Sequence, residues 1–185
     1  LGYDFIAGCV VKIDYAKGTV DAIPTGTFQP PPNAVILDAT LDDNVPMVAM
    51  KINDVVGDHF ILDTGADDVV AFTGFAKQHA AALEDHSEKK LVSRYFNVVT
   101  ASGVGGKLRM RATVLDRMQL GNVLYRDHLV MVMLGGQADF EGEDADGLVG
   151  VSALRAFDVY LDYANSRVVL VPNRFTRAAT NRDLK

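Results

Sequence analysis

Cysteine, tryptophan and long apolar runs are scarce or missing in this sequence of 185 residues. Its one cysteine, Cys9, excludes an internal disulfide and a zinc site built from cysteines. Apolar runs such as Leu129–Leu134 are far shorter than the roughly 20 residues of a membrane-spanning helix, and no signal-peptide pattern opens the sequence. We therefore expect no membrane span in these residues.

Positively charged residues are fewer than negatively charged ones. The sequence has 18 Lys and Arg residues against 24 Asp and Glu residues, which gives a net charge of −6. A protein that binds nucleic acid through its charge is therefore excluded. Apolar residues make up 49% and charged residues 23%, which is the composition of a globular protein with an ordinary core.

Several familiar catalytic patterns are missing too. The sequence has no Gly-x-Ser-x-Gly elbow and no His-Glu-x-x-His metal motif. The glycines before Lys107 fit neither a Rossmann nor a P-loop pattern, because Leu108 stands where glycine, serine or threonine is needed. The acidic loop Asp139–Asp146 does not fit the ligand spacing of a calcium loop. We expect no metal and no cofactor, and interpret the histidines as structural or exposed: His59, His79, His86 and His128.

Comparison of the sequence with itself reveals a repeat. At an offset of 148 residues, Gly2–Pro24 aligns with Gly150–Pro172, and seven of the 23 positions are identical. Average residue usage gives about one or two identities by chance. The identical pairs are Gly2/Gly150, Val11/Val159, Asp14/Asp162, Tyr15/Tyr163, Ala16/Ala164, Val20/Val168 and Pro24/Pro172. We interpret the first segment as the tail of one repeat that precedes a whole second repeat; two unrelated hairpins are the alternative.

A proline-rich segment separates the two copies. Four of the six prolines lie within residues 24–33, which is typical of a linker. The predicted organisation is a repeat tail over 1–24, a linker over 25–33, a domain over 34–172 and a C-terminal tail over 173–185. We expect the first tail to be ordered, with Val10–Asp14 and Thr19–Ile23 packed against the hairpin over 158–172, because an unpaired apolar sheet edge invites association.

Short apolar runs separated by turn residues predict a mainly β domain. The expected strands are Ala34–Ala39, Pro46–Ile52, His59–Leu62, Arg94–Thr100, Leu108–Leu115, Val123–Tyr125, Leu129–Leu134, Asp158–Tyr163 and Arg167–Val171. Thr73 is expected to cap a helix. The apolar face of that helix carries Phe75, Ala76, His79, Ala80 and Leu83. A second, shorter helix is expected over Ser152–Phe157.

The third apolar run leads into a chemical motif, His59-Phe60-Ile61-Leu62-Asp63-Thr64-Gly65-Ala66-Asp67-Asp68. A strand that ends in Asp-Thr-Gly-Ala resembles the active-site loop of aspartic proteases, and the longer match resembles their retropepsin branch. A second marker of the family is Leu148-Val149-Gly150, followed by a short helix and a final hairpin. The resemblance covers residues 46–172. It implies a retropepsin-like β-barrel lobe with one or two short helices, and it favours an extracytoplasmic location.

The resemblance also implies roles for the motif residues. Asp63 would be one of two catalytic carboxylates, and Thr64 would place its hydroxyl in a hydrogen-bond lattice with the partner loop. Gly65 would leave room for the backbone close to the carboxylate. We expect Ala66, Asp67 and Asp68 to contact substrate. A simple turn after a strand is the alternative reading of the tripeptide Asp-Thr-Gly.

Two carboxylates suit peptide hydrolysis without a metal. One group must take a proton from water while another gives a proton to the substrate, and a pair that shares one proton does both. The sequence contains a single Asp-Thr-Gly, so it supplies one of the two carboxylates. The partner is then a preceding lobe of the same chain or a second copy, and the lobe is expected to be inactive as a monomer. The alternative function is a non-catalytic lobe that binds peptide or mediates dimerisation.

A flap over the substrate is expected from Thr100–Lys107, where three glycines allow mobility between two strands. An ordinary glycine hairpin explains the segment equally well. The candidate substrate-binding residues in it are Ser102, Gly103, Val104, Gly105 and Gly106.

One position departs from the retroviral pattern. Val151 and Ser152 follow Gly150, where retroviral enzymes carry an arginine that pairs with the aspartate after the motif. Asp67 therefore lacks its expected partner unless Arg155 or Arg94 replaces that arginine.

Overall fold

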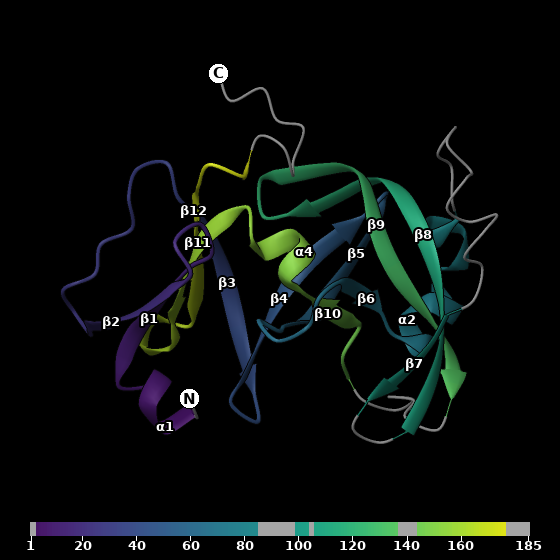
Figure 1. Cartoon of the computed structure of the whole chain (residues 1–185), viewed down its shortest axis with the longest axis horizontal. Coiled ribbons are helices and arrows are strands. Elements are labelled where there is room, and N and C mark those ends of the chain that lie inside the picture. The colour runs from purple at the N-terminus through teal and green to yellow at the C-terminus, as the bar shows by residue number, and fades with distance from the viewer. Residues whose placement is uncertain (1–2, 85–98, 104–105, 137–143, 177–185) are drawn as a thin grey trace.

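A closed β-barrel of six strands forms the body of the molecule (Figure 1). The structure is a computed structural model and describes residues 3–84, 99–103, 106–136 and 144–176. The barrel strands, in hydrogen-bonded order, are β4 (Val45–Ile52), β5 (Val55–Leu62), β10 (Gly147–Val149), β6 (Val69–Ala71), β9 (Val123–Gly136) and β8 (Gly106–Leu120). Pairing of β8 with β4 closes the ring. Every barrel strand therefore has a hydrogen-bonded neighbour on both sides over at least part of its length.

Alternating side chains and tight turns explain these strands. Along β3 (Val35–Asp42) the first six residues alternate between buried and exposed, as a strand with one buried face requires. Asp43 and Asn44 connect β3 to β4 with φ values of 43° and 68°. Two successive residues of positive φ form the turn that suits the twist of a two-residue hairpin, and Asp and Asn tolerate this conformation.

A second group of strands lies beside the barrel (Figure 1). Its order is β2 (Thr19–Pro24), β1 (Cys9–Asp14), β11 (Phe157–Asp162), β12 (Arg167–Pro172) and β3. We refer to these five strands as the terminal sheet. β3 pairs with β12 through its first half and with β4 through its second half, so it joins the terminal sheet to the barrel. The predicted packing of the N-terminal segment on the last hairpin is confirmed, because β1 pairs with β11.

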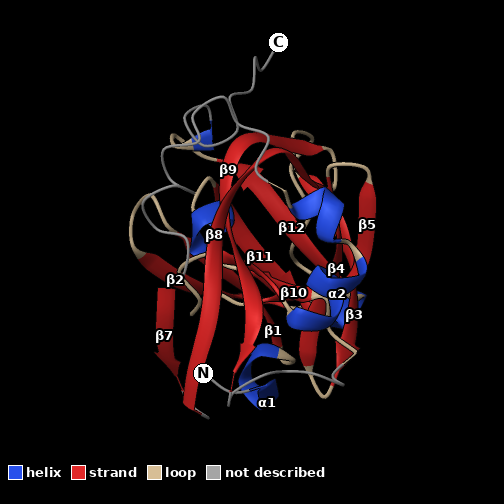
Figure 2. Ribbon diagram, turned by 90° about the vertical axis from the view of Figure 1, so that its right-hand side faces the viewer, coloured by secondary structure: helices blue, strands red, loops and turns tan. Residues whose placement is uncertain are grey.

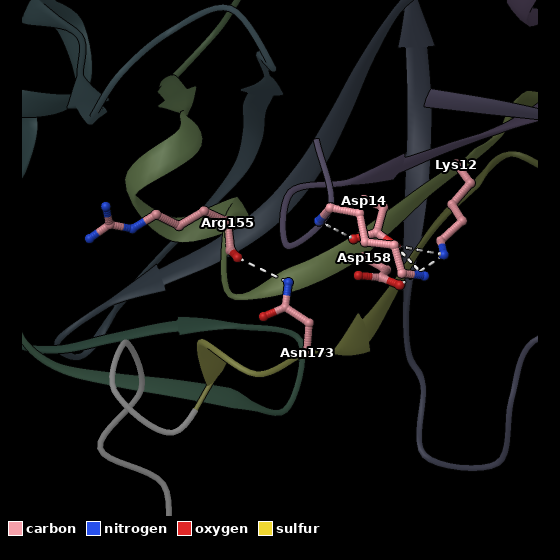
Figure 3. Close-up of polar contacts among 6 residues, drawn as sticks. Lys12, Asp14, Arg155, Asp158 and Asn173 are labelled. Atoms are coloured by element: carbon pink, nitrogen blue, oxygen red, sulfur yellow. Dashed lines mark hydrogen bonds and ion pairs between the residues drawn. The ribbon is translucent and has the colours of Figure 1, made fainter. Parts of the chain in front are cut away.

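Lys12 ties the two halves of the terminal sheet together (Figure 3). Its Nζ lies 3.2 Å from Asp14 Oδ2 on β1 and 3.0 Å from Asp158 Oδ2 on β11. The hydrogen bond to Asp158 is the main reason why the pKa of Lys12 is raised. The strand pairing is therefore reinforced by an ion pair that burial partly shields from solvent.

The same three elements occur twice at a constant spacing. α1 (Tyr3–Ile6), β1 and β2 in the N-terminal segment correspond to α4 (Val151–Leu154), β11 and β12, and every boundary differs by 148 residues. The turns agree as well. Gly18 and Ser166, which also lie 148 residues apart, both have positive φ.

The helices are few and short (Figure 2). α2 (Thr73–Gln78) is followed by a 3₁₀ turn over Ala80–Leu83, so the predicted helix is divided in two. The prediction that Thr73 caps the helix is wrong: Phe72 holds the cap position, and the Thr73 hydroxyl has no hydrogen-bond partner among the described residues. The cap moves because Phe72 continues the extended chain from β6, which leaves Thr73 inside the first turn.

One face of the predicted helix is buried only in part. Phe75 and Leu83 are buried, whereas Ala80 is exposed, because the chain leaves the helix at His79. Asn53 donates its side-chain amide to the Ala82 carbonyl, and Thr113 donates its hydroxyl to the Leu83 carbonyl. These contacts hold the 3₁₀ turn against the barrel.

Most predicted strands are present, with three differences. The runs predicted over Val123–Tyr125 and Leu129–Leu134 form one strand, β9, because its pairing with β8 continues through Arg126 and His128. The three-residue strands β6 and β10 were not predicted as strands. Only Val99 and Thr100 of the run predicted over Arg94–Thr100 are described, and they belong to β7 (Val99–Gly103).

The described residues include no helix long and apolar enough to cross a membrane.

Candidate active site

Asp63 opens the connection between β5 and β6. Its backbone N–H donates to the Val149 carbonyl of β10 at 3.1 Å, so the neighbouring strand holds its backbone in place. Its Oδ1 accepts the N–H of Gly65 at 2.8 Å. Asp63 is half-buried, whereas Thr64 and Gly65 are exposed. The carboxylate is thus fixed at the end of a barrel strand and remains accessible.

Gly65 lies very close to this carboxylate. A Cβ at Gly65 would lie 3.3 Å from Asp63 Oδ1, closer than most carbon atoms approach an oxygen. The glycine therefore lets its N–H reach the carboxylate without crowding.

The second sequence marker packs directly on the loop of the first. The N–H groups of Val151 and Ser152, in the first turn of α4, donate to the carbonyls of Ala66 and Asp67, both at 2.8 Å. A Cβ at Gly150 would lie 2.2 Å from the Asp68 carbonyl oxygen and 2.7 Å from that of Ala66. Only glycine fits between α4 and the loop, so the two markers form one unit. We call the loop over residues 63–68 the Asp loop.

Behind the Asp loop, Asp68 lines a pocket with side chains from β9 and α4. The other lining residues are Arg126, Asp127, His128, Leu129, Ser152 and Arg155. Burial raises the pKa of Asp68, the negative charge of Asp67 adds to the rise, and Arg155 opposes it. No ion pair joins Asp67 to Arg155 among the described residues, and Arg94 lies outside them. Within the described chain, the charge of Arg155 acts on Asp68.

His128 belongs to the same pocket and is held neutral. Its Nε2 lies 3.4 Å from the Ser152 hydroxyl, and its ring packs edge-on against Tyr125 with centroids 5.2 Å apart. Burial lowers the pKa of His128 to about 4, and the positive charge of Arg155 adds to the effect. Arg155 itself lies at the end of α4, where its carbonyl accepts the side-chain amide of Asn173 at 3.1 Å (Figure 3).

The lowered pKa of His128 predicts a loss of stability in acid. The folded chain takes up this proton only near pH 4, whereas the unfolded chain takes it up near pH 6.5. Stability is therefore full above pH 6.5 and falls as the pH drops towards 4, by about 3 kcal/mol at most from this group. Urea unfolding at pH 7 and pH 4 should show a smaller fall for His128→Gln than for the unaltered chain.

His59→Gln is the matched control, because His59 is exposed. The raised pKa of Asp68 acts in the opposite direction, since it stabilises the protein as the pH falls, but it is common to all three proteins. An equal fall in His128→Gln and His59→Gln would contradict the prediction.

A small apolar cluster lies on the face of the sheet that carries Asp63. Ile61 precedes Asp63 by two positions and so points to the same face, while Leu62 points into the main core. Leu148 pairs with Ile61 and Val70 pairs with Leu148, which extends this apolar face across three strands. The cluster contains Met47, Ile61, Val70, Phe72, Leu108, Met110, Met131, Met133, Ala145 and Leu148. The sequence analysis did not identify it, because its members come from six separate segments.

The same cluster connects the predicted flap with β5, the strand that leads into the Asp loop. β7 and β8 form an antiparallel hairpin in which Gly103 pairs with Gly106, and Leu108 and Met110 of β8 belong to the cluster. Ser102, Gly103 and Gly106 lie in the hairpin strands, whereas Val104 and Gly105 lie outside the described residues. The base of the hairpin therefore packs on the strands that carry Asp63.

Tyr15 brings the N-terminal segment into the surroundings of Asp63. Burial raises the pKa of Tyr15, and the negative charge of Asp63 raises it further. Its hydroxyl is buried and makes no hydrogen bond to any described residue. The sequence offered one signal for this residue, its identity with Tyr163 in the second copy, but no role was predicted from it.

The chain is similar to known proteins in one family model and in a solved structure. No curated protein matches the sequence. Among solved structures, the chain is similar to a retropepsin-like aspartic protease from Rickettsia conorii, with 20% identity and a TM-score of 0.46 over 74% of this chain and 89% of that one. The family model of aspartyl proteases matches residues 48–153, which is more than half of the chain and includes the Asp loop and Gly150. By this match, the chain belongs to the aspartyl protease family.

Proposed function

We propose that the chain is one lobe of an aspartic endopeptidase and that Asp63 supplies one of its two catalytic carboxylates. The observation that carries the proposal is the setting of Asp63. Its backbone is held by Val149 and its Oδ1 by the Gly65 N–H, yet the side chain remains accessible. A catalytic carboxylate needs both a fixed position and access to water and substrate.

The proposed reaction is hydrolysis of a peptide bond by an activated water molecule. One carboxylate of the pair removes a proton from water as the water attacks the carbonyl carbon, and the other, protonated, donates to the carbonyl oxygen. The proton taken from water then passes to the leaving nitrogen as the carbon–nitrogen bond breaks, and the other carboxylate recovers its proton from a hydroxyl of the intermediate. Thr64 would hold the two loops together through its hydroxyl, so that the carboxylates stay close enough to share one proton.

Substrate would lie over the Asp loop and beneath the β7–β8 hairpin. The cluster between them is largely buried, and its partly buried members, Ile61, Met110, Met131 and Leu148, would contact apolar side chains of the substrate. Two of these four are methionines, whose flexible side chains adapt to different shapes. Ala66, Asp67 and Asp68 would contact the peptide next to Asp63. The glycines of the hairpin strands, Gly103 and Gly106, would let backbone amides approach the peptide from the other side.

The second carboxylate would come from a partner, since the sequence holds a single Asp-Thr-Gly. A preceding lobe of the same chain and a second copy of this chain are both compatible with this requirement. The recurrence of helix, strand and strand at a spacing of 148 residues supports an internal repeat. If the partner had lost its aspartate, the lobe would serve peptide binding or dimerisation alone.

The proposal predicts a bell-shaped dependence of hydrolysis on pH with an optimum below pH 7. Activity requires the singly protonated pair, so it falls in acid when both carboxylates are protonated and in base when both are ionised. The rate of cleavage of an unfolded protein substrate, measured across the pH range with and without a chelator, checks this. A flat profile, or loss of activity with the chelator, would contradict an Asp pair.

A further inference from the structure

We propose that the outer edge of β2 is the docking edge for a β3-like strand of a preceding lobe in the same chain. The inference rests on the proposed function, which needs a second lobe but leaves its source open. The inference identifies the second lobe as a preceding part of the same chain and identifies the strand through which that lobe attaches. Three observations carry it: the register of the terminal sheet, the exposure of β2 and the pairing of β3.

The register of β1 on β11 has the symmetry of the repeat. Val11 pairs with Leu161, and Ile13 pairs with Val159. Adding 148 to the first member of each pair and subtracting it from the second exchanges the two pairs. Lys12 pairs with Tyr160, which is its own counterpart in the repeat. An approximate two-fold axis therefore passes between Lys12 and Tyr160 and exchanges the two copies.

The same axis relates β2 to β12, whose outer neighbour is β3. Arg167 pairs with Asp38, and the pairing continues to Leu170 with Val35. The matching positions on β2 are residues 19–22. β2 is the last strand of the sheet among the described residues, so this edge has no strand beside it.

Exposure differs sharply between the two copies at the same place. Val20 and Val168 are the same residue at the same position in the repeat, but Val20 is 58% exposed and Val168 is 0% exposed. Val169 and Leu170 are also fully buried, whereas their counterparts, Asp21 and Ala22, are exposed. A lobe placed on β2 as β3 and the barrel lie on β12 would remove Val20 from water.

A second copy of the chain cannot supply this strand intact. Its own β3 is already paired with β12 along one half and with β4 along the other. It would have to open its own sheet to reach β2. A preceding repeat would have its own β3-like strand about 148 residues upstream of Val35. By the repeat symmetry that strand belongs beside β2, so it can pair with β2 without opening another sheet.

A tandem protein tests the proposal. Residues 34–148 are joined directly to Leu1, which places a second lobe in the register of the repeat and keeps the full chain. Hydrogen exchange is measured at the amides of residues 19–22 in the tandem protein and in the 185-residue chain. We expect exchange in this segment to be slower by about tenfold or more in the tandem protein, because outward N–H groups gain partners.

Two substitutions in the original chain portion give matched controls. Val20→Asp would place a charge in the docked interface and should abolish the protection. Val56→Asp should leave it unchanged, because Val56 is also an exposed valine, at 54%, but lies on β5 away from β2. Replacing Asp63 by asparagine in both lobes should not alter the protection, so docking and catalysis are read separately.

Unchanged exchange of residues 19–22 in a folded tandem protein would overturn the proposal, whether or not it cleaves peptides. Protection without hydrolysis would uphold the docking edge and reject the proposed function. Sedimentation of the 185-residue chain gives a test that does not depend on how the added lobe folds. A dimer that Val20→Asp dissociates would overturn the proposal in favour of a second copy, while a monomer, or association that Val20→Asp leaves intact, supports it.

Discussion

Replacing Asp63 with asparagine should lower peptide hydrolysis by the assembled two-lobed protein by about 10²–10⁴-fold, the usual contribution of a general acid or base. Asparagine keeps the shape of the side chain but can neither accept the proton from water nor share one with a partner carboxylate. Folding should be nearly unaffected, because the Asn side-chain oxygen can still accept the Gly65 N–H that Asp63 Oδ1 accepts. Initial rates and urea unfolding of the same preparation measure both effects.

Asp58→Asn is the control for this substitution. Asp58 lies on β5, the strand that leads into Asp63, and is exposed. The substitution Asp58→Asn removes one negative charge from the same region and leaves the Asp loop unchanged. The rate of hydrolysis by this variant should therefore equal that of the unaltered protein. Turnover by Asp63→Asn at the level of Asp58→Asn would contradict the assignment of Asp63.

Replacing Gly150 with alanine should lower the free energy of unfolding by about 3 kcal/mol, the upper part of the range for overpacked sites. The new Cβ would lie 2.2 Å from the Asp68 carbonyl oxygen and 2.7 Å from that of Ala66. Both obstacles are backbone atoms, so relief requires the Asp loop and α4 to separate. Urea unfolding at neutral pH measures the loss.

The separation should also loosen the bonds that Val151 and Ser152 donate to the loop, and hydrolysis should fall with stability. Gly74→Ala is the control, because a Cβ there meets no atom within 4 Å and alanine favours a helix over glycine by up to about 1 kcal/mol. The prediction is wrong if Gly150→Ala is as stable as Gly74→Ala.

The sequence predicted the parts of the fold that depend on local pattern. The mainly β architecture with short helices follows from apolar runs and turn residues, and β1 was expected on the last hairpin because the repeat supplies matching strands. The Asp loop was identified from the motif at Asp63 together with the marker at Gly150. The structure adds the reason for that association, since Gly150 packs on the carbonyls of the loop.

Other features depend on contacts that a single sequence does not reveal. Three-residue β6 is too short to show a periodic pattern, and the cap moved from Thr73 to Phe72 because the preceding strand continues through Phe72. The charge of Asp63 acts on Tyr15 only because β1 joins the terminal sheet. The apolar cluster assembles from strands far apart in sequence. Burial lowers the pKa of His128, and the residues next to it in the sequence do not indicate that burial.

The most direct test of the central claim is the hydrolysis rate of four tandem proteins, with Asp63 kept or changed to asparagine in each lobe. Two carboxylates that act as one unit lose their function together, so a single substitution should remove as much activity as both. We therefore predict one active protein and three that are equally inactive. Proteins with one remaining Asp63 that retain about half of the full rate would show that each lobe works alone and would contradict the shared Asp pair.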